Sequence, residues 1–299
     1  MISSFSPSDL SVPELHGYLL TAVSPRPIAF ASTVNGQGVP NLAPFSFFNV
    51  FSSNPPVMIF SPARRGRDNT TKHTYENVMK VKEVCINIVS YDLVQQCSLA
   101  STEYDEGVNE FVKAGLTEMA SETIRPPRIA ESPVQFECEV IDVIHLGEQG
   151  GAGNLVLAEV KKFHVHDRIL NAEGKIDPLK IDTVGRCGGN WYNRVNESNM
   201  FEVTKPLRNK GIGIDHIPDD IRLSRILTGN DLGMLGNVEL LPDETDVNEY
   251  KLIELSDLFI EYEDRQDQLE IELHKKAKEL LADGRVLDAW KTLLTFNNG

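Results

Sequence analysis

The chain has 299 residues, 41% hydrophobic and 24% charged, a composition typical of a globular protein with one large domain or two smaller ones. Its formal charge of −15 argues against a general nucleic-acid binder, which needs a basic face to replace the counterions of phosphate groups. The charge is uneven, because residues 218–299 hold 19 acidic and 9 basic residues.

The sequence carries no sign of export or membrane insertion. The opening "MISSFSPSDL" lacks the basic and apolar regions of a signal peptide. No run approaches the 18 consecutive apolar residues of a transmembrane helix. The four cysteines lack metal-type spacing, and Cys85 and Cys138 sit in apolar runs that favour buried free thiols. We therefore expect a cytoplasmic protein without a membrane partner.

The first two-thirds of the chain reads as antiparallel strands. Apolar patterns predict strands at 27–34, 56–60, 83–90, 134–146 and 154–167, with "NGQG" (35–38) as a hairpin turn. The glycine-rich segment 147–154 predicts a plain hairpin turn, because no helix follows it. Helical patterns are confined to about 70–82 and 91–101. This favours a mainly β fold, a β-barrel with a few helices, over a doubly wound sheet.

The pattern changes around residue 215. The stretch "DHIPDDIRLSRILTG" predicts a short helix that a glycine ends. Apolar residues at three- and four-residue steps predict one amphipathic helix over 249–283, ended near Gly284, and another over "VLDAWKTLL". We therefore divide the chain into a barrel domain, 1–217, and an acidic helical extension, 218–299. The extension either packs on the barrel or clasps a dimer or another partner.

Arg26 stands between two prolines in "SPRPIAFAST", ahead of an alternating strand. Because proline fixes φ and has no N–H, Pro25 and Pro27 predict a stiff strand entrance that presents the guanidinium. An arginine held in this way loses little conformational entropy when it binds an anion. Arg26 is therefore a candidate anion ligand.

Two further segments suggest a binding site. The segment "NLAPFSFFNVFSSNPP" (41–56) is rich in phenylalanine and small polar residues. Its main-chain N–H groups and Asn49 could bind the edge of a flat ligand ring. The alternative is that its phenylalanines pack in the barrel core. "SPARRGRDNTTKHTYEN" (61–77) gathers Arg64, Arg65, Arg67 and Lys72 before a predicted helix. Cations, hydroxyls and free helix N–H groups suit a phosphate monoester, and a solvated turn is the alternative.

A fourth segment, "GRCGGNWYNRV" (185–195), surrounds Arg186 with glycines that allow close backbone approach. This segment is either a bend that binds a ligand or a glycine-rich bend without ligand contact. His164 and His166 would share one strand face, but too few ligands lie nearby, so we expect no metal site.

Together, these segments favour a phosphorylated, planar, aromatic cofactor, a shape that flavin mononucleotide (FMN) has. Pyridoxal phosphate is the less suitable candidate, because its enzymes use a lysine and segment 27–56 contains none. A Rossmann dinucleotide site needs a G-x-G-x-x-G run after a strand, which the chain lacks.

The four segments, over roughly residues 15–210, resemble the flavin reductase-like, FMN-binding split-barrel family, in its branch with a Ser-Pro-Arg-Pro opening. The resemblance implies a Greek-key split barrel, a homodimer, and FMN near the subunit contact, with FAD as the alternative. The residues it assigns to the cofactor are Arg26, Ser32, Thr33, Ala43, Ser46, Phe48, Asn49, Arg64, Lys72 and Thr74. Where the family usually has Lys-Asp-Thr this chain has Lys72-His73-Thr74, so which threonine and which basic residue meet the phosphate stays open.

The resemblance further implies that His164 lies on the nicotinamide or substrate side, with Arg186 and Tyr192 at the pocket rim. The activity it implies is a flavin reductase-type oxidoreductase that takes hydride from NAD(P)H onto flavin and passes electrons to free flavin or another acceptor. The protein would orient the ring and stabilise its reduced, anionic form. The alternative is an FMN-binding electron carrier without NAD(P)H activity of its own.

Overall fold

The computed structural model describes residues 1–296, which form two compact units, the first Met1–Phe201 and the second beginning at Glu202. The division lies ahead of the predicted boundary between residues 217 and 218. The reason is that Ile212 and Ile217 pack into the apolar core of the second unit.

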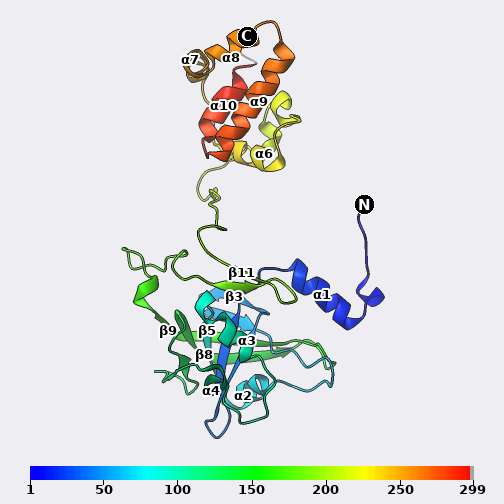
Figure 1. Ribbon diagram of the computed structural model, residues 1–299, viewed down its shortest axis with the longest axis vertical. Helices are drawn as coiled ribbons and strands as arrows, with labels where there is room; N and C mark the ends of the chain where they lie inside the picture. The colour runs from blue at the N-terminus through cyan, green and yellow to red at the C-terminus, as the bar shows by residue number, and fades with distance from the viewer. Residues whose placement is uncertain (297–299) are drawn as a thin grey trace. The chain divides into compact units, whose positions relative to one another are not determined.

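The first unit is built on one antiparallel sheet of seven strands in the order β2-β1-β5-β8-β9-β4-β3. Figure 1 labels β3, β5, β8 and β9 of this sheet. Its strands are β1 (Ala29–Val34), β2 (Pro40–Phe45), β3 (Phe48–Ser53), β4 (Pro56–Phe60), β5 (Glu83–Ile88), β8 (Val134–His145) and β9 (Asn154–Val165). The predicted mainly β architecture is confirmed, and so are the five predicted strands. The predicted turns at 35–38 and 147–154 join β1 to β2 and β8 to β9.

The two edge strands of the sheet, β2 and β3, are consecutive in the chain. β2 ends at Phe45 and β3 begins at Phe48, so Ser46 and Phe47 alone join strands that lie at opposite ends of the strand order. The sheet must therefore curl back on itself, and it forms a barrel that is split between β2 and β3. Pro44 is accommodated in β2 because an edge strand has one side without strand partners.

Short helices and small hairpins surround the sheet. The helices are α1 (Val12–Ala22), α2 (His73–Val81), α3 (Val94–Leu99) and α4 (Glu110–Ala114), with single turns η1 (Pro7–Asp9), η2 (Tyr91–Leu93) and η3 (Asp167–Ile169). The hairpins pair β6 (Glu118–Met119) with β7 (Arg128–Ile129), and β10 (Val184–Arg186) with β11 (Tyr192–Arg194). The helices that the sequence predicts over 70–82 and 91–101 match α2 and α3, whereas α1 and α4 have no predicted counterpart.

Helix α1 is held to the barrel by Arg26. The Arg26 guanidinium donates from one nitrogen to the carbonyls of Leu20 and Val23 (the latter at 2.8 Å), at the C-terminal end of α1. A cation is favourable there because the helix dipole leaves the last carbonyls negative. The Arg26 backbone also exchanges two hydrogen bonds of 2.9 Å with Arg186 of β10. Arg26, at the entrance to β1, therefore anchors α1 to the barrel.

A buried carboxylate, Glu137 on β8, fastens the segment between β6 and β7. It accepts hydrogen bonds from the backbone of Glu122 at 2.8 Å and from the backbone and hydroxyl of Thr123, both at 2.6 Å. His164 Nε2 lies 2.8 Å and Arg128 Nε 3.7 Å from the same carboxylate. Burial opposes ionisation, but these hydrogen bonds lower the pKa of Glu137 to about 2.

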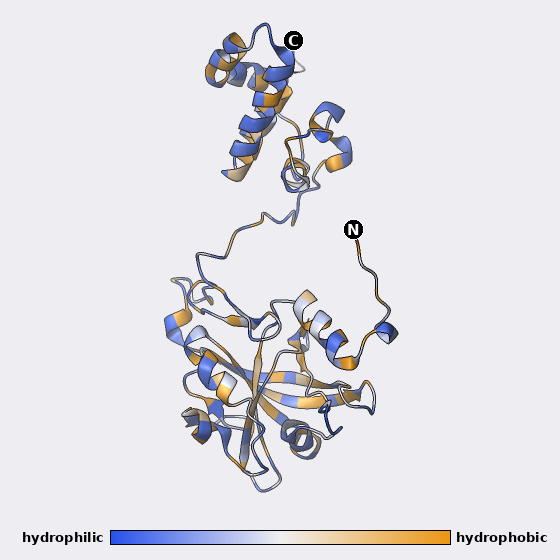
Figure 2. Ribbon diagram, turned by 45° about the vertical axis from the view of Figure 1, so that its right-hand side comes forward, coloured by the Kyte–Doolittle hydropathy of each residue, from blue (hydrophilic) through white to orange (hydrophobic). Residues whose placement is uncertain are grey.

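The second unit is helical, with η4 (Ile214–His216), α5 (Asp219–Arg222), α6 (Gly229–Leu235), α7 (Glu244–Glu254), α8 (Ser256–Glu261), α9 (Gln266–Ala282) and α10 (Val286–Leu294). Hydrophobic and hydrophilic residues share these helices (Figure 2). The core contains the fully buried Trp290, whose indole N–H donates to the Leu235 carbonyl at 3.0 Å.

Two helix predictions for this unit are wrong. The predicted helix over 249–283 is three helices, because Leu255 (φ −124°) and Arg265 (φ −134°) leave the helical conformation. The predicted helix ending at Gly229 is the four-residue α5, and Gly229 instead begins α6, because Thr228 and Asp231 form a capping box there. The end near Gly284 and the last helix are confirmed.

Within residues 1–296, no helix combines the length and apolar character needed to cross a membrane. The four cysteines are free, and Cys85, Cys97 and Cys138 are buried.

Replacing Arg26 with alanine is expected to loosen α1. The variant removes charge-assisted hydrogen bonds to the last carbonyls of the helix, each of which contributes about 1.5–3 kcal/mol. Amide hydrogen exchange over residues 12–22 should rise by roughly 10- to 100-fold. The amides of β8 in the same sample are the internal control; unchanged exchange in α1 would contradict the anchoring role.

Replacing Glu137 with glutamine is expected to destabilise the first unit by about 3 kcal/mol at neutral pH. The pKa of Glu137 is lowered on folding from 4.5 to about 2, so its contribution is present above about pH 4.5 and is lost as the pH falls towards 2. Urea unfolding should show that the free energy of unfolding of the wild type falls between about pH 4.5 and pH 2. The free energy of unfolding of the variant should depend less on pH over this range.

The matched control is Glu139→Gln on the same strand, because that carboxylate is largely exposed and pairs with Lys161 at the surface. It should change stability by less than about 1 kcal/mol. Equal losses of stability in the two variants would show that the hydrogen bonds to Glu137 stabilise the fold no more than a surface ion pair does.

Candidate cofactor-binding cleft

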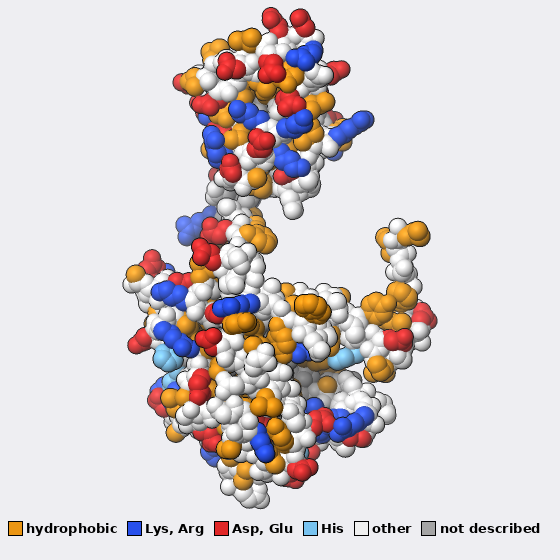
Figure 3. All heavy atoms as spheres, viewed as in Figure 1, with side chains coloured by type: hydrophobic (Ala, Val, Ile, Leu, Met, Phe, Trp, Pro, Cys, Tyr) orange, Lys and Arg blue, Asp and Glu red, His pale blue; other side chains and the backbone are white. Residues whose placement is uncertain are grey.

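A cavity of about 560 Å³ opens at the split of the barrel. Its lining comes from α1, from the link between β2 and β3, and from the cationic turn, residues 61–72, with contributions from Glu103 and Gly151. The space-filling view is hollowed beneath α1, with basic side chains at the lower rim (Figure 3). The phenylalanine-rich and arginine-rich segments therefore meet in one cleft, as the sequence predicts.

The link Ser46–Phe47 forms one wall of the cleft. Phe47 is 40% exposed, and its ring lies 6.0 Å from that of His16 on α1, at an interplanar angle of 88°. The Phe47 carbonyl accepts a 2.9 Å hydrogen bond from the backbone N–H of Ser61. The start of the cationic turn is thus tied directly to the split between the two edge strands.

The cationic turn is ordered by its own hydrogen bonds. Arg64 donates through Nε and one terminal nitrogen to the side chain and carbonyl of Asn69, both at 2.7 Å. Asn69 adopts a left-handed conformation with φ +58°, which asparagine tolerates better than most residues. Arg65 donates to the hydroxyl of Thr70 at 3.0 Å and to the carbonyl of Thr71. The turn is therefore preorganised.

The glycine-rich turn between β8 and β9 supports the cationic turn from outside. The Arg64 N–H donates to the Ala152 carbonyl at 2.9 Å, and the Gly151 N–H donates to the Arg64 carbonyl at 3.0 Å. A Cβ atom at Gly150 would lie 3.0 Å from the Arg65 carbonyl oxygen, so the close approach depends on glycine there. The predicted hairpin turn also contributes to the cleft.

Unsatisfied polar groups in the cleft indicate its ligand. The buried hydroxyl of Ser61 has no hydrogen-bond partner within residues 1–296, and Ser61 lines the cleft. Lys72 is the N-cap residue of α2 and makes no side-chain capping bond, so the first N–H groups of this helix add positive potential nearby. Cations, an unpaired hydroxyl and an exposed aromatic ring fit a phosphorylated planar molecule.

Three of the predicted cofactor residues, Ser46, Arg64 and Lys72, line the cleft. Ala43 and Thr74 line a small adjoining cavity of about 40 Å³, which shares Lys72 with the cleft. The Thr74 hydroxyl is buried and accepts a 2.9 Å hydrogen bond from the Asn41 amide. These five residues therefore lie around one region.

The other predicted cofactor residues lie outside the lining of the cleft. Ser32 and Thr33 are fully buried in β1, where they bond to the Pro127 carbonyl and the Asn77 amide. Phe48 packs against the barrel core, and the exposed Asn49 accepts a hydrogen bond from the Val50 N–H. Arg26 holds the end of α1, as described above.

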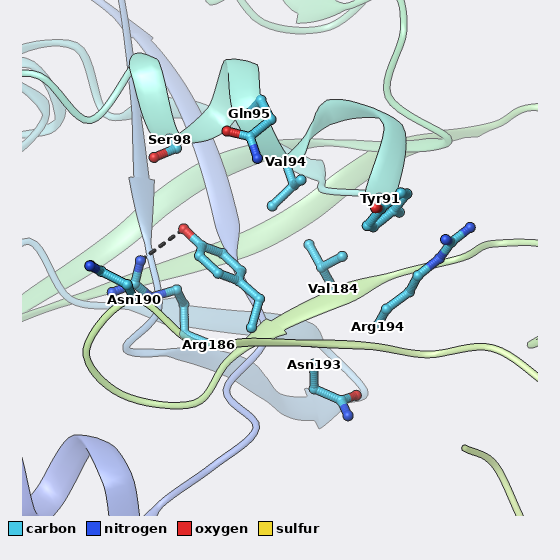
Figure 4. Close-up of a pocket in the computed structure, with 10 residues that line it drawn as sticks. Tyr91, Val94, Gln95, Ser98, Val184, Arg186, Asn190, Asn193 and Arg194 are labelled. Carbon is cyan, nitrogen blue, oxygen red and sulfur yellow. Dashed lines mark hydrogen bonds between the residues drawn. The ribbon is translucent and has the colours of Figure 1, made fainter. Parts of the chain in front are cut away.

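The structure separates His164 and Arg186 from the cleft lining. His164 contacts the buried Glu137. Arg186 lines a second cavity of about 370 Å³, where it donates to the Tyr192 hydroxyl at 2.8 Å (Figure 4). It also donates to the Gly189 carbonyl at 2.7 Å. Arg186 meets the predicted anion ligand Arg26 through the two backbone hydrogen bonds described above, but neither His164 nor Arg186 lines the cleft.

Sequence reasoning missed the contribution of α1 to the cleft, through Val12, Pro13, His16 and Leu20, and did not single out Ser61 within the predicted binding segment 61–77. A signal for α1 was present, because "SVPE" (11–14) has the spacing of a capping box with proline inside the helix start. No sequence signal marked Ser61, since its unpaired hydroxyl depends on the packing around it.

Comparison with known proteins agrees with this geometry. The family described as "flavin reductase like domain" matches residues 22–180. An uncharacterised protein of Halalkalibacterium halodurans is 36% identical over 203 residues, covering 67% of this chain and 95% of that protein.

Two solved structures are similar in fold. Nitrilotriacetate monooxygenase component B from Bacillus cereus superposes with a TM-score of 0.63 and 28% identity, over 68% of this chain and 99% of that one. A split-barrel protein of Shewanella frigidimarina, assigned as a flavin reductase, superposes with a TM-score of 0.56 and 25% identity. The match covers 68% of this chain and 100% of that one. The chain belongs to the flavin reductase-like family of split-barrel proteins.

Proposed function

We propose that the first unit binds FMN in the cleft at the split of the barrel and works as an NAD(P)H-dependent oxidoreductase of the flavin reductase type. The observation that carries the proposal is the meeting of the cationic turn with the Ser46–Phe47 link around one cavity of about 560 Å³. This volume lies within the range of about 300–1,000 Å³ that is usual for small-molecule and cofactor sites.

Lys72 and Arg65 are the cations we assign to the phosphoryl group. Two nitrogens of Arg64 are engaged by Asn69 within the turn, whereas Arg65 Nε and Lys72 Nζ face the Glu103 carboxylate. We therefore assign Arg64 mainly to shaping the turn. In the described part of the chain, the one ion pair of Lys72 Nζ is with the Glu103 carboxylate, at 3.5 Å. Its ammonium is therefore available to an incoming phosphate.

The wall of the cleft formed by Ser46 and Phe47 suits the ring. Ser46 and Phe47 offer an exposed aromatic face and main-chain polar groups, and the unpaired Ser61 hydroxyl lies in the same lining. A bound flavin would accept hydride from NAD(P)H and pass electrons onward. The chain orients the ring, limits its contact with water, and directs N–H groups at its polar edge. Arg186 and Tyr192 remain our candidates for the substrate side, with FAD as the alternative flavin.

The direct test is to identify the chromophore that co-purifies with the full chain, by mass, and then to mix the holoprotein anaerobically with NADH and with NADPH. The proposal predicts FMN and prompt bleaching of the flavin absorbance by one or both nucleotides. An electron carrier would retain its flavin colour, and a colourless protein that cannot be reconstituted with FMN would contradict the proposal.

Replacing Lys72 with methionine is expected to weaken FMN binding by roughly 10- to 100-fold, because one charge-assisted contact to phosphate is lost. Riboflavin, which lacks the phosphate, should bind the variant and the wild type within about twofold. Titration of flavin fluorescence measures both affinities.

The control is Lys80→Met on the same helix, since Lys80 is exposed and lies outside the cleft lining. It should leave FMN affinity unchanged. Equal weakening of FMN and riboflavin by Lys72→Met would show that Lys72 does not contact the phosphate.

We extend the proposal to a homodimer, because the edge strand β3 exposes Val50 at 60% and Phe51 at 64%, an apolar edge that a second copy would cover. Sedimentation equilibrium is expected to give twice the chain mass, and Phe51→Asp should shift it towards the monomer. A wild-type protein that stays monomeric at micromolar concentration would contradict this part of the proposal.

A further inference from the structure

Among the described residues that line the cleft, Glu103 is the one acidic side chain. It lies between α3 and α4, in a segment without helix or strand hydrogen bonding over residues 103–105. Its side chain is 36% exposed. The residue is therefore placed at the cationic turn without being part of the core.

The Glu103 carboxylate contacts three cations of the turn. Its Oε1 lies 3.1 Å from Arg65 Nε and 3.5 Å from Lys72 Nζ, and its Oε2 lies 2.6 Å from an Arg67 terminal nitrogen. Both carboxylate oxygens are thus used. Partial burial opposes ionisation, but the hydrogen bond from Arg65 and the charges of Lys72 and Arg67 lower the pKa of Glu103, so it is anionic at neutral pH.

A carboxylate that bridges two of the proposed phosphate ligands occupies their donors. A phosphoryl group needs the same N–H groups and the same positive charge, so the two anions compete for them. A structural alternative is that Glu103 holds the cations in the correct positions for the phosphate. Arg65 argues against this role for Glu103, because bonds to Thr70 and Thr71 fix its guanidinium independently.

We propose that the Glu103 carboxylate competes with the flavin phosphate: it pairs with Arg65 and Lys72 and is displaced when a phosphorylated flavin binds. This inference rests on the proposed function. The cost of displacing Glu103 reduces the affinity for the phosphorylated ligand and leaves a flavin without phosphate unaffected. Glu103 thereby raises the dissociation rate of a bound phosphorylated flavin.

The test compares Glu103→Gln with the wild type, using FMN and riboflavin as probes. The amide keeps the size of the side chain and removes its charge. FMN should bind the variant roughly tenfold more tightly, and most of the gain should come from slower dissociation. Riboflavin affinity should stay within about twofold. Fluorescence titration gives the affinities, and stopped-flow dilution gives the dissociation rate.

Glu106→Gln is the matched control, because Glu106 lies three positions away, is exposed and forms no ion pair within residues 1–296. It should change neither FMN nor riboflavin binding. A combined Lys72→Met and Glu103→Gln variant provides a second reading: if the two side chains compete through shared contacts, the gain from Glu103→Gln should shrink when Lys72 is absent.

Weaker or unchanged FMN binding by Glu103→Gln would overturn this inference and leave the proposed function intact. Weaker binding would identify Glu103 as a residue that positions the cations. Equal tightening of FMN and riboflavin also overturns it, because the effect would not depend on phosphate. Failure of the wild type to bind either flavin overturns the proposed function and this inference together.

Discussion

The connection between the two edge strands determines where the site of this protein lies. Because β2 and β3 stand at opposite ends of the strand order but are joined by Ser46 and Phe47 alone, the sheet has to curl until its edges approach. The link is then left at the opening of the barrel, and the hydrogen bond from Ser61 to the Phe47 carbonyl brings the cationic turn to the same place. A cleft at this opening is a consequence of the connectivity, and α1 completes its wall.

The charges in this cleft run against those of the whole chain. A protein with a formal charge of −15 gathers Arg64, Arg65, Arg67 and Lys72 within nine positions. The structure assigns them different tasks: Arg64 orders the turn through Asn69, whereas Arg65 and Lys72 face Glu103. Glu103 pairs with Arg65, Arg67 and Lys72 within the lining of the cleft, and Asp68 pairs with Arg67 from outside that lining, so these two carboxylates reduce the positive potential of the turn.

The strands and the convergence of the two binding segments could be predicted from sequence, because alternating apolar residues and a local concentration of cations are visible along the chain. The role of Arg26 could not. Its flanking prolines indicate rigidity, but the partner of its guanidinium, the end of α1, depends on a helix that lies earlier in the chain. The contact of His164 with Glu137 and the unpaired hydroxyl of Ser61 likewise follow from tertiary packing. In the second unit, three helices share one amphipathic pattern, and the breaks at Leu255 and Arg265 leave that periodicity intact.

A crystal structure of the full chain grown with FMN tests the central claim most directly. The account predicts the phosphoryl group within hydrogen-bonding distance of Lys72 and Arg65, the ring beside Ser46 and Phe47, and the Glu103 side chain turned away from both cations. Flavin density in the second cavity, next to Arg186, or a cleft filled by its own side chains, would contradict it.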